Sequence, residues 1–384
     1  MDGLDAAILR AMFRSGEWSL DGVDPLLSPT EIAQRVGRSP NTVRRRLAGW
    51  RTEGFLQGFA AIPNPGLLGL DVHLQLLVVE GLNGCERFEH ELDLLETPAI
   101  VYRMGTSYGV FAVTRGGRTA ARDRERLRRL PSLRLVSDPI PISFPPPARA
   151  MRRADWQLLA ALRAEPSVTP RAVCLREGGS ARSCHRRLAS WLDGNLVFFL
   201  PLLDFEHARG TVAWIGSVVN SRVDAGTIDH VVGKAFPDRI RIQNVFPIER
   251  LFPPPPGGER SGSLQFFLPA HSAQSAEVAY ARFCHLPGVG QAMLAFPTRN
   301  YALPSVIDDA IAETLEHGGT GEGRAAAVSA TLAESSFDRI PRPAVGGEGI
   351  AAIRPSGLIQ TASGTTSRPA LEGSIRRPAL SRKS

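Results

Sequence analysis

The stretch that decides the fold reads Ser39-Pro40-Asn41-Thr42-Val43-Arg44-Arg45-Arg46-Leu47-Ala48-Gly49-Trp50. Its first two residues are typical of a helix start, because serine caps the first turn and proline fits the first helical position. At roughly 100° per residue, one side of the predicted helix is apolar and faces a core. That side holds Val43, Leu47 and Trp50. The opposite side carries polar residues that suit a nucleic-acid duplex, namely Asn41, Thr42, Arg44 and Arg45.

A second short helix is predicted just before this one. Ser28-Pro29-Thr30-Glu31 offers a capping serine, a proline at the first position and a glutamate three residues after the cap. Gly37 then permits a tight turn. Two short helices joined by a glycine turn predict a helix-turn-helix, whose second helix reads the major groove. Arginine can pair with guanine and asparagine with adenine, and we expect Arg38 and Ser39 on backbone phosphates. The segment from Gly54 to Phe59 is expected to form the strands of a wing.

An internal repeat organises the rest of the chain. Arg45-Arg46-Leu47-Ala48-Gly49-Trp50 matches Arg186-Arg187-Leu188-Ala189-Ser190-Trp191 at an offset of 141, whereas Leu4 to Met12 matches Ala154 to Leu162 at an offset of 150. The first copy therefore carries nine extra residues within Ser15 to Leu27. The order of the matching strings predicts a tandem duplication.

The second helix-turn-helix keeps its core side and presents a different outer side. The residues predicted to face outward are Arg182, His185 and Arg186. The run from Leu196 to Leu200 is unusually apolar for an exposed wing. It could pack against the neighbouring domain and keep this copy off DNA, so direct DNA contact by the second copy stays open.

Each helical module is followed by a strand and helix pattern of the order β-α-β-β-α-β, which is the ferredoxin-like arrangement. The predicted fold class is α+β, with a winged helix-turn-helix plus a ferredoxin-like domain duplicated in tandem. The predicted domains are 1–65 (DNA-binding), 66–147 (effector and oligomerisation), 148–205 (second winged helix-turn-helix) and 206–305 (second ferredoxin-like). Residues 317–384, rich in Gly, Ala, Ser, Pro and Arg, are expected to form a disordered basic tail.

Composition adds little to this interpretation. The net charge is +7, but the tail holds nine basic and five acidic residues and so supplies much of it. Apolar runs are too short for a membrane helix and the start is acidic, so we expect a cytoplasmic protein. The four scattered cysteines (Cys85, Cys174, Cys184 and Cys284) predict small buried residues rather than a disulfide framework or a zinc site. No metal, cofactor or catalytic motif is predicted.

The first half resembles the leucine-responsive and asparagine-type regulators, the Lrp/AsnC family, and the whole resembles its double-length members. The resemblance rests on Glu31-Ile32-Ala33, Val36-Gly37-Arg38-Ser39-Pro40, Thr42-Val43-Arg44-Arg45-Arg46-Leu47 and Gly54-Phe55-Leu56-Gln57-Gly58-Phe59. It implies double-stranded DNA as partner, self-association, and a small effector such as an amino acid. The effector would lie at the turn Gly105-Thr106-Ser107-Tyr108, although the aspartate that usually closes this turn in the family is missing here.

The predicted function is therefore a sequence-specific DNA-binding transcriptional regulator that is not an enzyme. One alternative is a tetrapyrrole enzyme, since siroheme decarboxylases resemble fused pairs of such units. They rely on His and Arg near the second and third strands, and this chain has Tyr102 and Arg103 there but no His. Another alternative is a co-regulator that acts through protein contacts alone.

Overall fold

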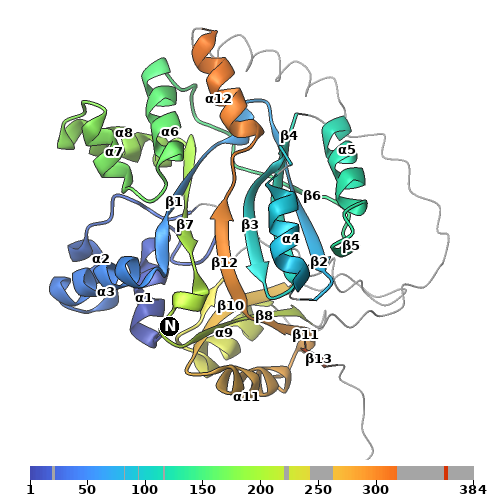
Figure 1. Cartoon of the computed structure of the whole chain (residues 1–384). Helices are drawn as coiled ribbons and strands as arrows, with labels where there is room; N and C mark the ends of the chain where they lie inside the picture. The colour runs from blue at the N-terminus through green and yellow to red at the C-terminus, as the bar shows by residue number, and fades with distance from the viewer. Residues whose placement is uncertain are drawn as a thin grey trace, which may run out of the picture.

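The computed structural model describes residues 1–19, 22–81, 83–93, 95–115, 117–219, 225–242, 263–317 and 359–361. Two groups of three helices lie on one side of the molecule, and two antiparallel sheets lie on the other (Figure 1). This mixed arrangement confirms the predicted α+β class. In the described part of the chain, no helix is long and apolar enough to cross a membrane.

The first helical module consists of α1 (Gly3–Met12), α2 (Pro29–Val36) and α3 (Pro40–Glu53). The second consists of α6 (Arg153–Ala164), α7 (Pro170–Arg176) and α8 (Ala181–Asp193). In both modules the last two helices begin after a serine or threonine whose side chain accepts a hydrogen bond from the first turn. The predicted caps at Ser28 and Ser39 are therefore confirmed, and Ser180 caps α8 in the same way as Ser39 caps α3.

One strand follows each module, and the two strands pair with each other. β1 (Leu56–Pro63) lies antiparallel to β7 (Val197–Leu203) and forms a two-stranded sheet with it. The predicted wing from Gly54 to Phe59 is wrong, because these residues lead into a single strand whose hydrogen-bonding partner comes from the other half of the chain. β7 is buried along its whole length, which explains why its sequence is so apolar.

The first large sheet has the strand order β12-β3-β4-β2-β5, with β6 also paired to β2. The elements of the first half are β2 (Asp71–Val79), α4 (Asn83–Leu92), β3 (Pro98–Met104), β4 (Ser107–Thr114), α5 (Gly117–Arg128), β5 (Leu133–Val136) and β6 (Ile140–Ile142). The order β3-β4-β2-β5 is that of a ferredoxin-like fold. The last strand of the predicted β-α-β-β-α-β pattern, which the sequence indicates at 133–142, is divided into two short strands that both pair with β2.

The second large sheet has the order β13-β11-β8-β10-β9. Its elements are β8 (Thr211–Val219), α9 (Ala225–Ala235), β9 (Ile240–Arg241), β10 (Ser263–Ala270), α11 (Ala273–Cys284), β11 (Val289–Ala295) and β13 (Ile359–Thr361). The order β11-β8-β10-β9 again matches a ferredoxin-like fold. The sequence of residues 253–262 is rich in proline and glycine and indicates a loop inserted between the middle strands, but these residues lie outside the described part of the chain, as does nearly all of the predicted tail.

The C-terminal part of the second half crosses to the first sheet. β12 (Pro297–Ala302) pairs antiparallel with β3, and Asn300 lies opposite Tyr102. A helix that the sequence did not predict, α12 (Val306–Glu316), follows and packs on α6 (Figure 1). The extended end near Leu303 was expected to complete the second ferredoxin-like domain, and instead it completes the sheet of the first half.

The nine-residue insertion packs between the two halves. Trp18 is 1% exposed, and its ring lies 5.1 Å from that of Phe267 and 6.4 Å from that of Tyr102, measured between centroids. The Trp18 amide donates to the Arg241 carbonyl at 2.8 Å, and the Val23 amide donates to the Phe199 carbonyl at 2.7 Å. The insertion therefore links the first helical module to β7 and to the second sheet.

Candidate nucleic-acid interface

The helix α2 is fixed by reciprocal capping. The Ser28 hydroxyl accepts from the Glu31 amide at 3.2 Å, and the Glu31 carboxylate accepts from the Ser28 amide at 2.7 Å. The Ser28 amide and the Ser28 hydroxyl both donate to the Glu31 carboxylate, and these two hydrogen bonds lower the pKa of Glu31 because they favour its charged form. Gly37, with φ +64°, then ends the helix in the left-handed conformation that glycine adopts without steric cost. The turn thus places Arg38 and Ser39 at the start of α3.

The helix α3 divides into a buried side and an exposed side, as its sequence predicted. Val43 is 0% exposed and Trp50 is 3% exposed, while Leu47 is half-buried. The Ser39 hydroxyl accepts from the Thr42 amide at 3.2 Å and lies 2.9 Å from the Thr42 hydroxyl. This cap fixes the first turn of the helix.

The three consecutive arginines of α3 have different surroundings. Arg46 points inward and pairs with Asp2 at 2.8 Å and with Asp5 at 3.3 Å. The buried Asp5 also accepts from the Trp50 indole N–H at 3.0 Å. Burial opposes ionisation of Asp2, but hydrogen bonds from backbone amides and the charge of Arg46 outweigh it and lower its pKa. Arg46 is therefore a structural residue that joins α3 to α1.

The other two arginines face solvent. Arg44 donates to the Asn41 side-chain oxygen at 2.6 Å, so these two side chains are held together on the exposed side. Arg38 and Arg45 are exposed and have no acidic partner among the described residues. The predicted set Arg38, Ser39, Asn41, Arg44 and Arg45 thus lies on one exposed surface at the start of α3, with Thr42 half-buried beside it. We call these six residues, Thr42 included, the α3 surface.

The second module presents Arg182, His185 and Arg186 in exposed positions on α8. Its inward arginine, Arg187, lies 3.6 Å from the buried Asp155, which corresponds to the Arg46–Asp5 pair of the first module. The indole N–H of Trp191 is buried and has no hydrogen-bond partner in the described part of the chain. Both modules therefore have an arginine–aspartate pair between their first and third helices. Only in the first does the aspartate also accept a hydrogen bond from the tryptophan indole.

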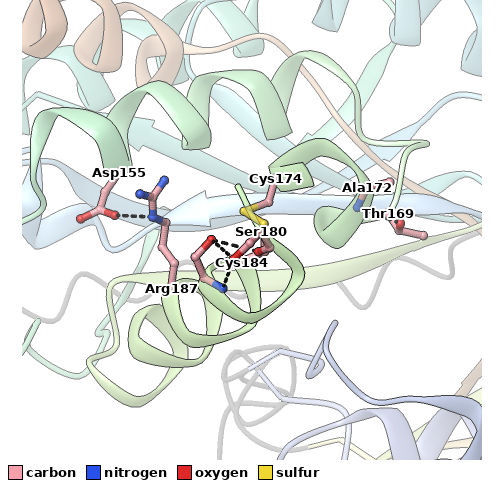
Figure 2. The surroundings of a disulfide bond; sticks show 8 residues. Asp155, Thr169, Ala172, Cys174, Ser180, Cys184 and Arg187 are labelled. Carbon is pink, nitrogen blue, oxygen red and sulfur yellow. Dashed lines mark hydrogen bonds and ion pairs between the residues drawn. A yellow bond between two sulfur atoms is a disulfide. The ribbon is translucent and has the colours of Figure 1, made fainter. Parts of the chain in front are cut away.

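Two cysteines of the second module are joined, which corrects the expectation of separate buried thiols. Figure 2 shows the disulfide between Cys174 of α7 and Cys184 of α8, and beside it the contact of Arg187 with Asp155. Gly179 in the intervening turn leaves room for this bond, since a Cβ there would lie 2.5 Å from the Cys184 sulfur. Sequence spacing gave no sign of it, because the two cysteines are ten positions apart and meet only through the packing of α7 against α8. Cys85 and Cys284 are free.

The predicted effector turn is tighter than expected. Only Gly105 and Thr106 connect the two strands, and Ser107 and Tyr108 belong to β4. Tyr108 is 1% exposed, and its hydroxyl donates to Glu89 of α4 at 3.0 Å. Burial raises its pKa. Its phenol thus belongs to the core between α4 and the first sheet.

The residues considered for tetrapyrrole chemistry make internal contacts. Tyr102 packs against Trp18 between the two sheets, and burial raises its pKa. Arg103 donates to Glu89 at 3.1 Å and to the Gly105 carbonyl at 3.2 Å. Among the described residues, no group of three or more His, Cys, Asp or Glu side chains could hold a metal ion.

Comparison with known proteins yields similarities of fold only. No protein-family model matches the chain, and no curated protein matches it. The siroheme decarboxylase NirDL, solved with an iron-uroporphyrin III analogue, is similar over 82% of this chain and 99% of its own, at 13% identity and a TM-score of 0.38. AsnC from E. coli matches 39% of this chain and 97% of its own, at 19% identity and a TM-score of 0.26. A transcriptional regulator from Neisseria meningitidis, solved with L-Met, matches 38% of this chain and 90% of its own, at 19% identity and a TM-score of 0.26.

Proposed function

We propose that this chain is a sequence-specific DNA-binding transcriptional regulator that reads the major groove with the α3 surface. The observation that carries the proposal is the division of the arginine run. Arg46 is held inside by Asp2 and Asp5, whereas Arg44 and Arg45 are exposed without an acidic partner in the described part of the chain. A surface with unpaired guanidinium groups at the start of the second helix of a helix-turn-helix suits phosphates and base edges.

Each residue of the α3 surface has a proposed role. Arg45 is exposed on the side of α3 opposite the buried Val43 and would pair with guanine in the major groove. Asn41, held by Arg44, would pair with adenine or position Arg44 over a phosphate. Arg38, Ser39 and Thr42 surround the N-terminal end of α3, where backbone amides favour a phosphate.

The second module would add contacts from Arg182, His185 and Arg186. The pairing of β1 with β7 joins the strands that follow the two modules in one antiparallel ladder, with a register shift between Leu56 and Gly58. The two reading helices would therefore be presented by one chain in a fixed relation, and the preferred DNA would contain two half-sites. Inverted half-sites would indicate that the two modules are related by a two-fold axis, and direct repeats would indicate that they point the same way along the DNA.

The test is selection of genomic fragments by the purified chain, followed by fluorescence anisotropy on the recovered sequence at near-physiological salt. We expect Arg44→Ala/Arg45→Ala to lower affinity at least about tenfold, since each base-contacting arginine contributes about 1–3 kcal/mol. Arg87→Ala/Arg129→Ala is the matched control. Both of its arginines are exposed, and each is paired with a glutamate four residues away in sequence. Because this variant also loses two arginines, the net charge changes equally. Failure of the wild-type chain to enrich any sequence would contradict the proposal.

The tetrapyrrole alternative is tested on the same protein. If the chain is a decarboxylase, siroheme should bind, change its visible absorbance and lose carbon dioxide. A regulator by protein contacts alone would instead bind neither DNA nor tetrapyrrole. We propose no enzyme activity, because Tyr102 and Arg103 are already engaged in packing and ion pairing.

We keep the small effector implied by the resemblance in the proposal, but with fewer contacting residues than the sequence suggested. Gly105, Thr106 and Ser107 lie at the end of the β3–β4 hairpin, whereas the Tyr108 hydroxyl is already bonded to Glu89. An amino-acid effector at this turn would therefore use backbone groups and the Ser107 hydroxyl. Thermal shift with a panel of amino acids tests it.

A further inference from the structure

A pocket of about 500 Å³ lies between β1, α6 and α12, away from the α3 surface and from the β3–β4 turn. Its wall is mainly apolar and contains one ion pair, Arg163 with Asp308. Six of the thirteen lining residues are alanines, namely Ala60, Ala61, Ala160, Ala164, Ala302 and Ala312. The hollow thus arises where small side chains from four elements, β1, α6, β12 and α12, face one another.

The corresponding place in the first half is occupied by aromatic side chains. At the offset of 150 that aligns α1 with α6, Phe13 stands where Arg163 stands. Phe13 is fully buried, and its ring lies 4.9 Å from that of Trp18, which the nine-residue insertion supplies. The second half has no such insertion. It therefore lacks two large rings at the position where the pocket is found.

The Arg163 guanidinium gives the pocket a hydrogen-bonding wall. Its side chain is only 10% exposed. It donates to the two Asp308 oxygens at 2.6 and 2.7 Å and to the Ala61 carbonyl at 3.0 Å. A guanidinium carries five N–H groups. Two of them therefore have no acceptor among the described residues, and a ligand in the pocket could accept from them.

Charge selects the class of ligand. Burial raises the pKa of Asp308, but the hydrogen bonds and the charge of Arg163 outweigh this effect and hold the pKa below its ordinary value. The carboxylate is therefore ionised at neutral pH and compensates the arginine. A ligand with its own carboxylate would meet Asp308, whereas a neutral carbonyl could accept from Arg163 without adding charge.

We propose that this pocket binds a neutral, mainly apolar small molecule whose carbonyl oxygen accepts a hydrogen bond from Arg163. Its volume lies within the range of about 300–1,000 Å³ that ligand pockets occupy, and a few convergent polar groups on an apolar wall are typical of them. The site contacts α6 of the second helical module, β1 of the first and α12. Occupancy would therefore fix the second module against the strand that follows the first.

The probe is Prodan, a neutral naphthyl ketone whose emission shifts to the blue in an apolar site and reports hydrogen bonding at its carbonyl. We expect saturable binding at one site per chain, measured without DNA, so that the result does not depend on the proposed reading of DNA. Ala312→Phe and Ala160→Leu place larger side chains in the pocket and should weaken binding at least about tenfold. Ala281→Phe, on the exposed side of α11, is the matched control and should bind as the wild type does.

Arg163→Met tests the polar wall separately. We expect affinity to fall about threefold to tenfold, the size of one neutral hydrogen bond, together with a further blue shift of the bound dye. Circular dichroism of each variant checks that the fold is retained. The proposal is overturned if both pocket-filling variants bind Prodan like the Ala281→Phe control. It is also overturned if the anionic dye ANS displaces Prodan and binds the site with the higher affinity of the two, because the proposal requires Asp308 to disfavour an anionic ligand.

Discussion

The two helical modules have the same frame but close their cores differently. In the first, Asp5 receives both Arg46 and the Trp50 indole, and Ala33 and Val43 pack between α2 and α3. In the second, a disulfide between Cys174 and Cys184 takes the place of Ala33 and Val43, and the Trp191 indole has no partner in the described part of the chain. The first module thus relies on a buried polar network and the second on a covalent link.

The outer surfaces differ in parallel with the cores. At the offset of 141, Arg38 is replaced by Gly179, the residue that leaves space for the disulfide. Arg44 is replaced by His185 and Asn41 by Arg182. A change that serves the core of the second module has therefore removed one cation from its outer surface. Under the proposed function, we therefore expect the first module to contribute more to DNA binding.

The largest effect should come from the buried carboxylates. Asp5→Ala leaves the buried Trp50 N–H without its acceptor and leaves Arg46 with Asp2 alone, and we expect it to lower the free energy of unfolding by about 3 kcal/mol. Asp155→Ala should cost about 1 kcal/mol, since Arg187 lies 3.6 Å away and is 41% exposed. Urea unfolding of both variants measures the difference. Equal losses would contradict the contrast between the two networks.

Reduction of the disulfide should have the next largest effect. Closing the short loop between Cys174 and Cys184 stabilises the second module by about 2–3 kcal/mol in the chain-entropy description. Dithiothreitol should therefore lower the unfolding midpoint of the wild type. The variant Cys174→Ala/Cys184→Val, which carries the residues of the first module, should be insensitive to the reductant. If dithiothreitol leaves the unfolding midpoint of the wild type unchanged as well, the disulfide does not contribute to stability.

DNA binding sharpens the comparison between the two outer surfaces. Arg45→Ala should cost about 1–3 kcal/mol of discrimination at one base pair if its contact is bidentate. Arg186→Ala, the corresponding change in the second module, should cost less than about 1 kcal/mol. Anisotropy titrations on a set of single-base variants of the selected sequence measure both. Equal weakening on every sequence would mean that Arg45 contacts only phosphate.

The smallest effect concerns the capping glutamate. The pKa of Glu31 is lowered in the folded chain by Ser28, so its stabilisation is present above the ordinary glutamate pKa and is lost as pH falls through the lowered one. The second module has Ala172 at this position and should show no such contribution. Glu31→Ala should therefore lower stability slightly at neutral pH and not at all in strong acid. Thermal unfolding at a series of pH values measures this difference.

Local patterns predicted the local structure well. The caps, the glycine turn and the apolar side of α3 all depend on residues close in sequence, and each is where the sequence indicated. The exposed positions of Asn41, Arg44 and Arg45 followed from helical periodicity alone. Their role in reading DNA stays a prediction.

Long-range pairing is what the sequence could not supply. An apolar run such as Leu196 to Leu200 can form a wing or a buried strand, and only its partner β1 decides between them. The inward direction of Arg46 and the burial of Tyr108 likewise depend on residues from other elements, and the disulfide depends on how α7 packs against α8. The pocket at α6 was not predicted, because it is formed by small residues that carry no motif.

The crossing of β12 to the first sheet also constrains how the chain can fold during synthesis. One edge of β3 pairs with β4, and the other edge pairs with β12. This second edge has no partner until residues 297–302 have left the ribosome, although β3 itself ends at Met104. An unpaired strand edge is a template for association with other chains. The first half would therefore pass through a period of aggregation risk that ends only when the last part of the second half arrives. A nascent chain truncated before Pro297 should need a chaperone that the complete chain does not.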